Sequence, residues 1–177
     1  PGTYTLTVTG PNGCVATDAV VVDENKTNPT VSVEGGVLTC TKTEITLTAV
    51  ASSGVTYVWS GHPSVNGLTT SSVVVDTIGA YIVTVKNTIN GCTASDTATV
   101  TQDITKPTVN LNTIKLTCES PSQTLTATTT NAGATPTYTW TVPSGVASPG
   151  NVASFAVTKA GAYSVVVTNS VNGCSVN

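Results

Sequence analysis

The stretch that decides the fold is Gly79-Ala-Tyr81-Ile-Val-Thr-Val-Lys-Asn-Thr-Ile-Asn90-Gly91-Cys92, and the chain carries it three times. The other copies are Gly2-Thr-Tyr4-Thr-Leu-Thr-Val-Thr-Gly-Pro-Asn12-Gly13-Cys14 and Gly161-Ala-Tyr163-Ser-Val-Val-Val-Thr-Asn-Ser-Val-Asn172-Gly173-Cys174. Each copy is a glycine turn, an alternating strand that holds a tyrosine, and an Asn-Gly corner that ends in cysteine. Asn-Gly between alternating apolar runs indicates a β-hairpin, because both residues tolerate positive φ.

The spacing of the copies predicts domains. Copies two and three lie about 80 residues apart, which is the period of a small domain and not of a short solenoid repeat. We therefore expect residues 1–27 to be the last hairpin of an incomplete upstream repeat, 28–105 a complete repeat, and 106–177 a repeat without its last strand. The chain begins inside a repeat and without a methionine, which favours an internal piece of a longer protein. For the missing strand, a cut repeat is the simpler interpretation, and a strand donated by a neighbouring chain is the alternative.

Short segments of period two match between the two long repeats. They are Leu38-Thr-Cys40 with Leu116-Thr-Cys118, Leu47-Thr-Ala49 with Leu125-Thr-Ala127, Tyr57-Val-Trp59 with Tyr138-Thr-Trp140, and Val73-Val-Val75 with Phe155-Ala-Val157. Alternation of apolar and polar residues is typical of half-buried strands in antiparallel sheets. Short strands between clusters of Gly, Pro, Asn and Ser indicate a sandwich. The predicted fold is all-β, with tandem immunoglobulin-like antiparallel β-sandwich domains arranged end to end.

Two aromatic residues are expected in the core of each sandwich. Trp59 and Trp140 are the largest apolar residues of the third strand in each repeat. Tyr81 and Tyr163 follow the glycine turn that opens the next-to-last strand, where a tyrosine hydroxyl can bond back to the corner backbone. A further short strand is expected over residues 66–70, and an enlarged loop over 128–136.

Composition excludes several classes of function. The net charge is −3, charged residues make up 8% of the chain, and threonine accounts for roughly a fifth of it. Nucleic-acid binding requires a basic surface, so no nucleic-acid partner is expected. No apolar run is long enough for insertion in a membrane. No nucleophile with its base and no paired carboxylates are evident, so we expect no enzyme and no cofactor. Five cysteines and no methionine fit an oxidising, extracellular setting.

The cysteines are more plausible as disulfides than as metal ligands, because no Cys-x-x-Cys spacing occurs and one histidine cannot complete a zinc site. Pairing within a repeat would join Cys40 to Cys92 and Cys118 to Cys174. Cys40 should lie at the downstream end of its domain and Cys92 at the upstream end, roughly 25 Å apart, against a Cα separation under about 7 Å in a disulfide. We therefore favour a disulfide between Cys40 and Cys174 across the junction, which would fix the angle between successive domains. Cys14, Cys92 and Cys118 would then pair with cysteines outside this chain. Pairing within a repeat and free thiols stay as alternatives.

Other polar residues give weaker signals. His62 is interpreted as a loop histidine, because no motif places a nucleophile beside it. Asp18 and Asp96 occupy equivalent places early in the last strand, which suits a turn or edge role. Residues 23–25 faintly resemble a calcium-binding junction, but the counterpart at 101–103 has too few oxygen ligands, so no metal site is expected.

The pattern Leu-Thr-Cys40, Ile45-Thr-Leu-Thr-Ala, Tyr57-Val-Trp-Ser, Gly79-Ala-Tyr and Asn90-Gly-Cys resembles the tandem immunoglobulin-like and PKD-like repeats of Bacteroidetes surface proteins. These include the SprB-type gliding-motility adhesins and other type IX secretion cargoes. A SprB repeat usually has a glycine-rich turn after its first cysteine; here residues 41–44 and 119–122 replace it, so the generic immunoglobulin-like repeat is the closer relative.

The resemblance implies a structural or adhesive segment of a secreted, outer-membrane-attached filament on the cell surface. Its partners would be neighbouring repeats, identical chains in a fibre, and surface glycans. Asp76-Thr77-Ile and Asp96-Thr97-Ala look like the O-glycosylation signal of that group, which makes Thr77 and Thr97 candidate acceptors. The alternative function is a carbohydrate-binding accessory module, which would require exposed aromatic residues on one face.

Overall fold

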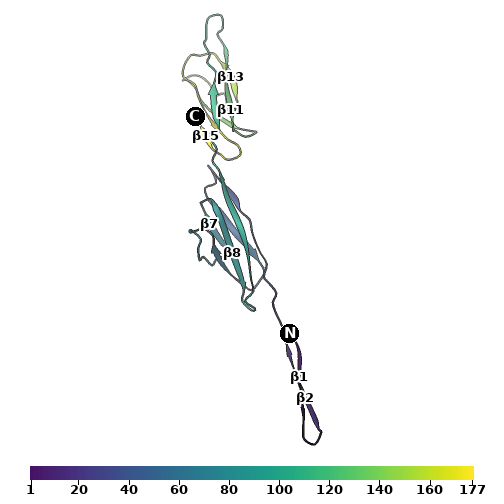
Figure 1. The fold of residues 1–177 in the computed structure, drawn as a ribbon. Coiled ribbons are helices and arrows are strands. Elements are labelled where there is room, and N and C mark those ends of the chain that lie inside the picture. The colour runs from purple at the N-terminus through teal and green to yellow at the C-terminus, as the bar shows by residue number, and fades with distance from the viewer.

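The computed structural model describes residues 1–177, and every regular element in it is a β-strand. An N-terminal hairpin, a first sandwich (domain 1) and a second sandwich (domain 2) follow one another along an elongated molecule (Figure 1). The structure contains no helix that could span a membrane. The fold is therefore all-β and contains two immunoglobulin-like sandwiches placed end to end.

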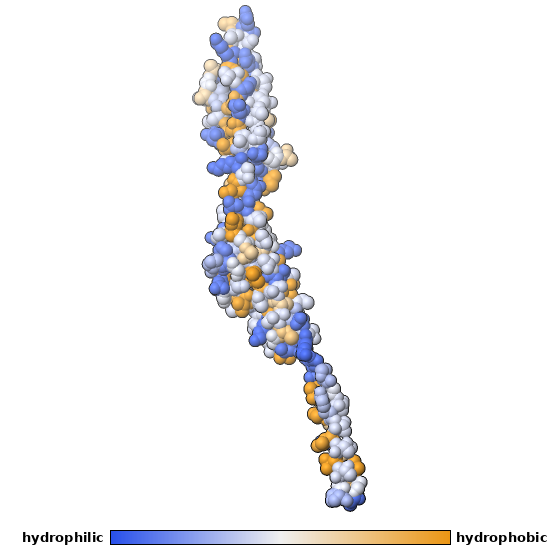
Figure 2. Space-filling view, in the orientation of Figure 1, coloured by the Kyte–Doolittle hydropathy of each residue, from blue (hydrophilic) through white to orange (hydrophobic).

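The hairpin consists of β1 (Gly2–Thr9) and β2 (Val15–Val22), paired antiparallel. Every residue of both strands is exposed, and apolar side chains lie open on its surface (Figure 2). The exposed apolar residues include Tyr4, Leu6 and Val8. Their counterparts in domain 1 are fully buried, so the hairpin has the composition of a sandwich sheet without a second sheet to cover it.

Domain 1 has seven strands in two sheets, one with the order β3-β5-β7 and one with the order β4-β9-β8-β6. The strands are β3 (Val31–Val33), β4 (Gly36–Thr39), β5 (Ile45–Ala51), β6 (Val55–Ser60), β7 (Ser72–Val75), β8 (Gly79–Asn87) and β9 (Thr93–Asp103). The inward residues of both sheets, together with Val65 from the loop after β6, form one core of 14 buried residues.

The sandwich departs from the purely antiparallel expectation at its first strand. β3 pairs with β5 in one sheet, and β4 crosses to the other sheet, where it pairs parallel with β9. The crossing occurs at Gly35, where a Cβ atom would overlap the backbone carbonyl of Thr99. Only glycine permits this close approach, so the first strand is divided between both sheets.

The expected strand over 66–70 is absent. These residues form turns and bends that meet the backbone of Trp59, whose N–H donates to Leu68 O at 2.8 Å and whose carbonyl accepts from Gly67 N at 2.9 Å. Val65, from the same loop, is 1% exposed and fills the core beside β6. A loop side chain thus does the packing that a strand would otherwise supply.

Domain 2 has six strands, in sheets of order β10-β11-β13 and β12-β14-β15. They are β10 (Thr108–Leu111), β11 (Gln123–Thr130), β12 (Thr137–Thr141), β13 (Ser154–Val157), β14 (Ser164–Thr168) and β15 (Ser175–Val176). β15 is a two-residue beginning of the last strand, which the sequence analysis did not expect. The enlarged loop is shorter than predicted, since β11 continues to Thr130 and residues 131–136 make the turn. The core has seven buried residues.

The four aromatic residues lie at equivalent places in the two domains. Trp59 is fully buried and donates its indole N–H to Thr70 O at 2.8 Å; Trp140 is 7% exposed and donates to Val152 O at 2.8 Å. The Tyr81 hydroxyl donates to Thr77 O at 2.8 Å, and that of Tyr163 to Lys159 O at 2.9 Å. Each tyrosine therefore ties the start of its strand to the turn four residues upstream.

Candidate functional site: a stapled domain junction

The candidate site is the junction between the two domains, where Cys40 and Cys174 form a disulfide with a Cα–Cα separation of 5.0 Å. Cys40 follows β4 at the downstream end of domain 1, and Cys174 precedes β15 at the upstream end of domain 2. This pairing is the one that the strand-end argument favours. Because each sulfur atom takes part in one disulfide only, this bond excludes both within-repeat pairs, Cys40 with Cys92 and Cys118 with Cys174.

The corner that carries Cys174 is held by its own backbone and by two asparagines. Asn169 N–H donates to Cys174 O at 2.8 Å, and Gly173 N–H donates to Asn169 O at 2.9 Å. The side-chain oxygen of Asn172 accepts from Cys174 N at 3.0 Å. Gly173 has a φ of 70°, which favours glycine. These bonds place Cys174, which is 1% exposed, at a fixed position on the corner.

The turn that carries Cys40 is equally defined. Thr39 N–H donates to Lys42 O at 2.9 Å, and Lys42 N–H donates to the Thr39 hydroxyl at 3.0 Å. A Cβ atom on Gly173 would overlap the side chain of Thr41, so the corner lies directly against this turn. Cys40 N–H also donates to Asn172 O at 3.1 Å across the junction. The disulfide is therefore one contact among several between two fitted surfaces.

Asn172 also holds the linker between the domains. Its amide nitrogen donates to the Asp103 carboxylate and to Thr105 O, both at 2.9 Å, and the residue is 1% exposed. The hydrogen bond from Asn172, followed by the one from the Thr105 backbone, lowers the pKa of Asp103 below its ordinary value. Asp103 ends β9, so this asparagine joins the last strand of domain 1 to the corner of domain 2.

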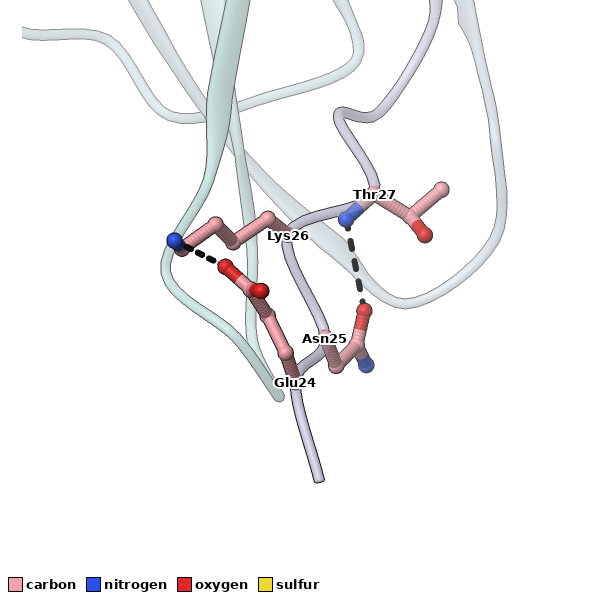
Figure 3. Close-up of polar contacts among 4 residues, drawn as sticks. All are labelled: Glu24, Asn25, Lys26 and Thr27. Atoms are coloured by element: carbon pink, nitrogen blue, oxygen red, sulfur yellow. Dashed lines mark hydrogen bonds and ion pairs between the residues drawn. The ribbon is translucent and has the colours of Figure 1, made fainter. Parts of the chain in front are cut away.

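The linker between the hairpin and domain 1 is held in the same way. Asn90, the counterpart of Asn172, donates its amide N–H to Asn25 Oδ1 at 3.0 Å and to Thr27 O at 2.9 Å. Asn25 Oδ1 also accepts from Thr27 N at 3.3 Å, and Glu24 pairs with Lys26 beside it (Figure 3). Sequence analysis missed this asparagine clamp; the signal was the repetition of Asn-Gly-Cys, interpreted there only as a turn.

The remaining cysteines lie either on a turn like that of Cys40 or on a corner like that of Cys174. Cys118 follows Thr117, whose N–H donates to Ser120 O at 3.1 Å and whose hydroxyl accepts from Ser120 N at 3.0 Å, as in the Cys40 turn. Cys92 N–H donates to Asn90 Oδ1 at 2.9 Å, as in the Cys174 corner.

The hairpin repeats the corner, since Cys14 N–H donates to Asn12 Oδ1 at 3.1 Å. No distant part of the chain lies against the glycines of the two unpaired corners. A Cβ atom on Gly13 would meet nothing within 4 Å, and one on Gly91 would meet only the Lys86 side chain at 3.8 Å. Cys14, Cys92 and Cys118 are free thiols in this structure, on supports like those of the bonded pair.

Asp96 and Asp18 have different surroundings despite their equivalent places. The Asp96 carboxylate accepts from Val33 N and from Thr97 N, both at 2.8 Å, and these bonds, that of Val33 first, lower its pKa. Asp96 thereby joins β9 to β3 across the edge of the sandwich. Asp18 accepts only from Ala19 N, at 2.9 Å, because the hairpin has no first strand beside it.

The other candidate residues lie apart from the junction. Thr77 and Thr97 are exposed, and Thr77 donates its hydroxyl hydrogen to Asp76 at 2.8 Å. His62 is in the loop after β6; its Nδ1 lies 2.8 Å from the Ser64 hydroxyl and its ring is 5.0 Å from that of Tyr81. No cluster of three or more His, Cys, Asp or Glu residues suited to a metal ion is present.

Known protein families give no match to the chain, and neither do curated proteins. Among solved structures, the "Crystal structure of Dscam1 isoform 6.44, N-terminal four Ig domains" is similar over 93% of this chain and 50% of that one. The sequence identity is 11% and the TM-score 0.34, and the chain spans about half the length of that structure.

Proposed function

We propose that this chain is a structural segment of a secreted bacterial surface filament or adhesin stalk, in which successive immunoglobulin-like domains are joined by a disulfide at every junction. The observation that carries the proposal is the Cys40–Cys174 disulfide between two separate domain cores. Persistent disulfides are characteristic of proteins outside the reducing cytosol.

The free cysteines extend the same rule along the filament. Cys118 would form a disulfide with the cysteine of the Asn-Gly-Cys corner in the following repeat. Cys92 would form one with the cysteine that is equivalent to Cys40 in the preceding repeat. Cys14 would do the same one repeat further upstream. The partners are neighbouring repeats of the same polypeptide, with identical chains in a fibre as a further possibility for the exposed strand edges.

The resemblance to Bacteroidetes surface repeats supports attachment to the outer membrane and export as a type IX cargo. Thr77 and Thr97 would carry O-linked glycans in that setting, where they would add hydrophilic surface to a chain that has few charges. The carbohydrate-binding alternative has less support, since both tryptophans are buried and Tyr4 of the hairpin is the one exposed aromatic side chain.

Protein isolated from its native source provides the test. Non-reducing peptide mapping should recover Cys92 and Cys118 in disulfides with cysteine peptides from other repeats. Antibodies against domain 1 should label intact cells, and labelling should disappear after protease treatment of the surface. Free thiols at both positions would contradict the stapled filament, and labelling only of permeabilised cells would contradict the location.

A further inference from the structure

Domain 2 contains an open groove of about 360 Å³ between the segment that follows β10 and the start of β14. One wall consists of Ile114, Lys115 and Leu116, and the other includes Val157, Gly161 and Tyr163. Five of the eight lining residues are hydrophobic. Domain 1 shows what fills the equivalent space when the last strand is present.

In domain 1 the equivalent space is filled by β9. Val100 lies between Gly36 on one side and Gly79 on the other, and Ala98 pairs with Tyr81. Ala98 and Val100 are 1% and 2% exposed. They cover the same features that domain 2 leaves open, namely the corner tyrosine, the turn glycine and the crossing segment.

The wall residues are correspondingly less buried in domain 2. Tyr81 is fully buried and Leu38 is 6% exposed, whereas Tyr163 and Leu116 are only half-buried. Residues 114–117 have no regular structure, although residues 36–39 form β4 in domain 1. The absence of a strand in the groove explains both differences, since β4 obtains its hydrogen bonds from β9.

β15 lies beside β14, and its direction leads toward the groove. It pairs with β14 through Val167↔Val176 and Thr168↔Ser175, in the register of Val85↔Ala94 and Lys86↔Thr93 in domain 1. Because the pairing is antiparallel, each residue added after Asn177 would pass one residue further back along β14. The positions opposite β14 and the residues before it therefore lead back to Gly161, which lines the groove.

We propose that this groove is an acceptor site for an extended strand that continues β15, antiparallel to β14 and parallel to residues 114–117. The occupant has the chemistry of β9: an aspartate opposite Val165, a small apolar residue opposite Tyr163, and a branched apolar residue opposite Gly161. The side chains between them are hydroxylated and face solvent. This site depends on the groove alone, so it would stand even if the proposed surface location were wrong.

One wall residue limits how close the strand can come. Thr113 occupies the place of Gly35, whose hydrogen faces the Thr99 carbonyl in domain 1. The occupant must therefore lie farther from residues 113–116 than β9 lies from β4. We expect tight pairing with β14 and looser pairing on the other side.

The test adds the eight residues Asp96–Asp103 directly after Asn177 of the full chain, so that the added aspartate faces Val165. The thermal midpoint of domain 2 should rise by about 5 °C or more. Amide hydrogen exchange at Tyr163 and Val165, whose N–H groups face the added strand, should slow by about tenfold or more, and exchange in domain 1 should stay unchanged.

Two matched extensions give the contrast. Ala98→Asp with Val100→Asp in the added segment places charges into the groove and should abolish both effects. Thr97→Asp with Thr99→Asp places the same charges on the solvent side and should preserve them. Thr113→Gly in the extended chain should increase protection at residues 114–116.

Equal midpoints and equal exchange for the parent chain and all extended chains would overturn the proposal. A free peptide of residues 96–103 should give weaker protection than the fused segment, because the fused strand starts in register. Protection by the free peptide without protection by the fused segment would overturn the continuity with β15 and assign the groove to a strand from a second molecule.

Discussion

Domain 1 and domain 2 share their sequence pattern and differ in how completely their cores are closed. Domain 1 buries 14 residues in its core cluster and domain 2 buries seven. β9 has 11 residues and pairs with both β8 and β4, whereas β15 has two residues and pairs only with β14. The last strand thus closes the sandwich and gives structure to the crossing segment opposite it.

The features that the domains have in common do not need the last strand. The tryptophan in each third strand and the tyrosine that bonds back four residues occur in both. Two of the features that differ involve β9: the β4 pairing and the bond from Val33 to Asp96. The comparison therefore separates a local framework from a closure that depends on long-range pairing.

The largest expected effect is the loss of stability when either core tryptophan is replaced by alanine. Trp59→Ala should lower the free energy of unfolding of domain 1 by about 3–5 kcal/mol, because it leaves a cavity in a closed core. Trp140→Ala should cost less, because the smaller core of domain 2 is more open to water. Chemical denaturation, with hydrogen exchange to assign each transition, measures both losses. Equal losses would contradict the difference in closure.

Removal of the staple should affect both domains together. Cys40→Ser with Cys174→Ser opens a covalent loop with a sequence separation of 134. Chain-entropy arguments give up to about 5 kcal/mol for such a loop, and we expect about 2–4 kcal/mol because the short linker already holds the domains adjacent. Calorimetry should show both midpoints lowered. Cys92→Ser with Cys118→Ser is the control, and unchanged midpoints in the first variant would contradict the structural role.

Two equivalent glycines distinguish a corner that packs against a turn of the neighbouring domain from a corner whose glycine has no such neighbour. Gly173→Ala and Gly91→Ala each place an alanine at a backbone φ near +70°. This strain should lower the free energy of unfolding by about 1 kcal/mol in each variant. Only Gly173→Ala also pushes against Thr41, so it alone should accelerate reduction of the Cys40–Cys174 disulfide by dithiothreitol. Equal reduction rates in the two variants would contradict the close fit of the junction.

The smallest effect is a dependence on pH. The pKa of Asp96 and that of Asp103 are lowered in the folded chain, so each contributes stability above the unfolded value near 3.8. That contribution is lost as the pH falls from there through the lowered pKa. Below about pH 4, Asp96→Asn should therefore show a shallower loss of domain 1 stability than the parent chain. Asp18→Asn should match the parent, and a parallel fall in all three chains would contradict the role of Asp96.

Much of this architecture could be predicted from local pattern. Asn-Gly-Cys corners, alternating strands and the domain period are properties of neighbouring residues, and they indicated two sandwiches in series. The topological argument about strand ends favoured Cys40 with Cys174, because it needs only the order of the strands.

The rest depends on contacts between distant segments. Gly35 faces Thr99, and no local pattern announces that the first strand crosses between sheets there. Asn172 looks like a turn residue in sequence, and its bond to Asp103 emerges only when the domains are joined. Residues 66–70 form no strand and Val65 from the same loop enters the core, a contact that no local pattern announces.

The disulfide has a consequence for how the molecule transmits a pull applied at its two ends. The shortest covalent route from Pro29 to Asn177 runs through residues 29–40, crosses the sulfur atoms, and leaves through residues 174–177. Residues 41–173, which include nearly all of both cores, lie off this route. They would add about 450 Å of extended chain if tension could reach them, at about 3.4 Å per residue. While the sulfur atoms stay bonded, tension bypasses these residues, and the two domains together behave as one short, almost inextensible link.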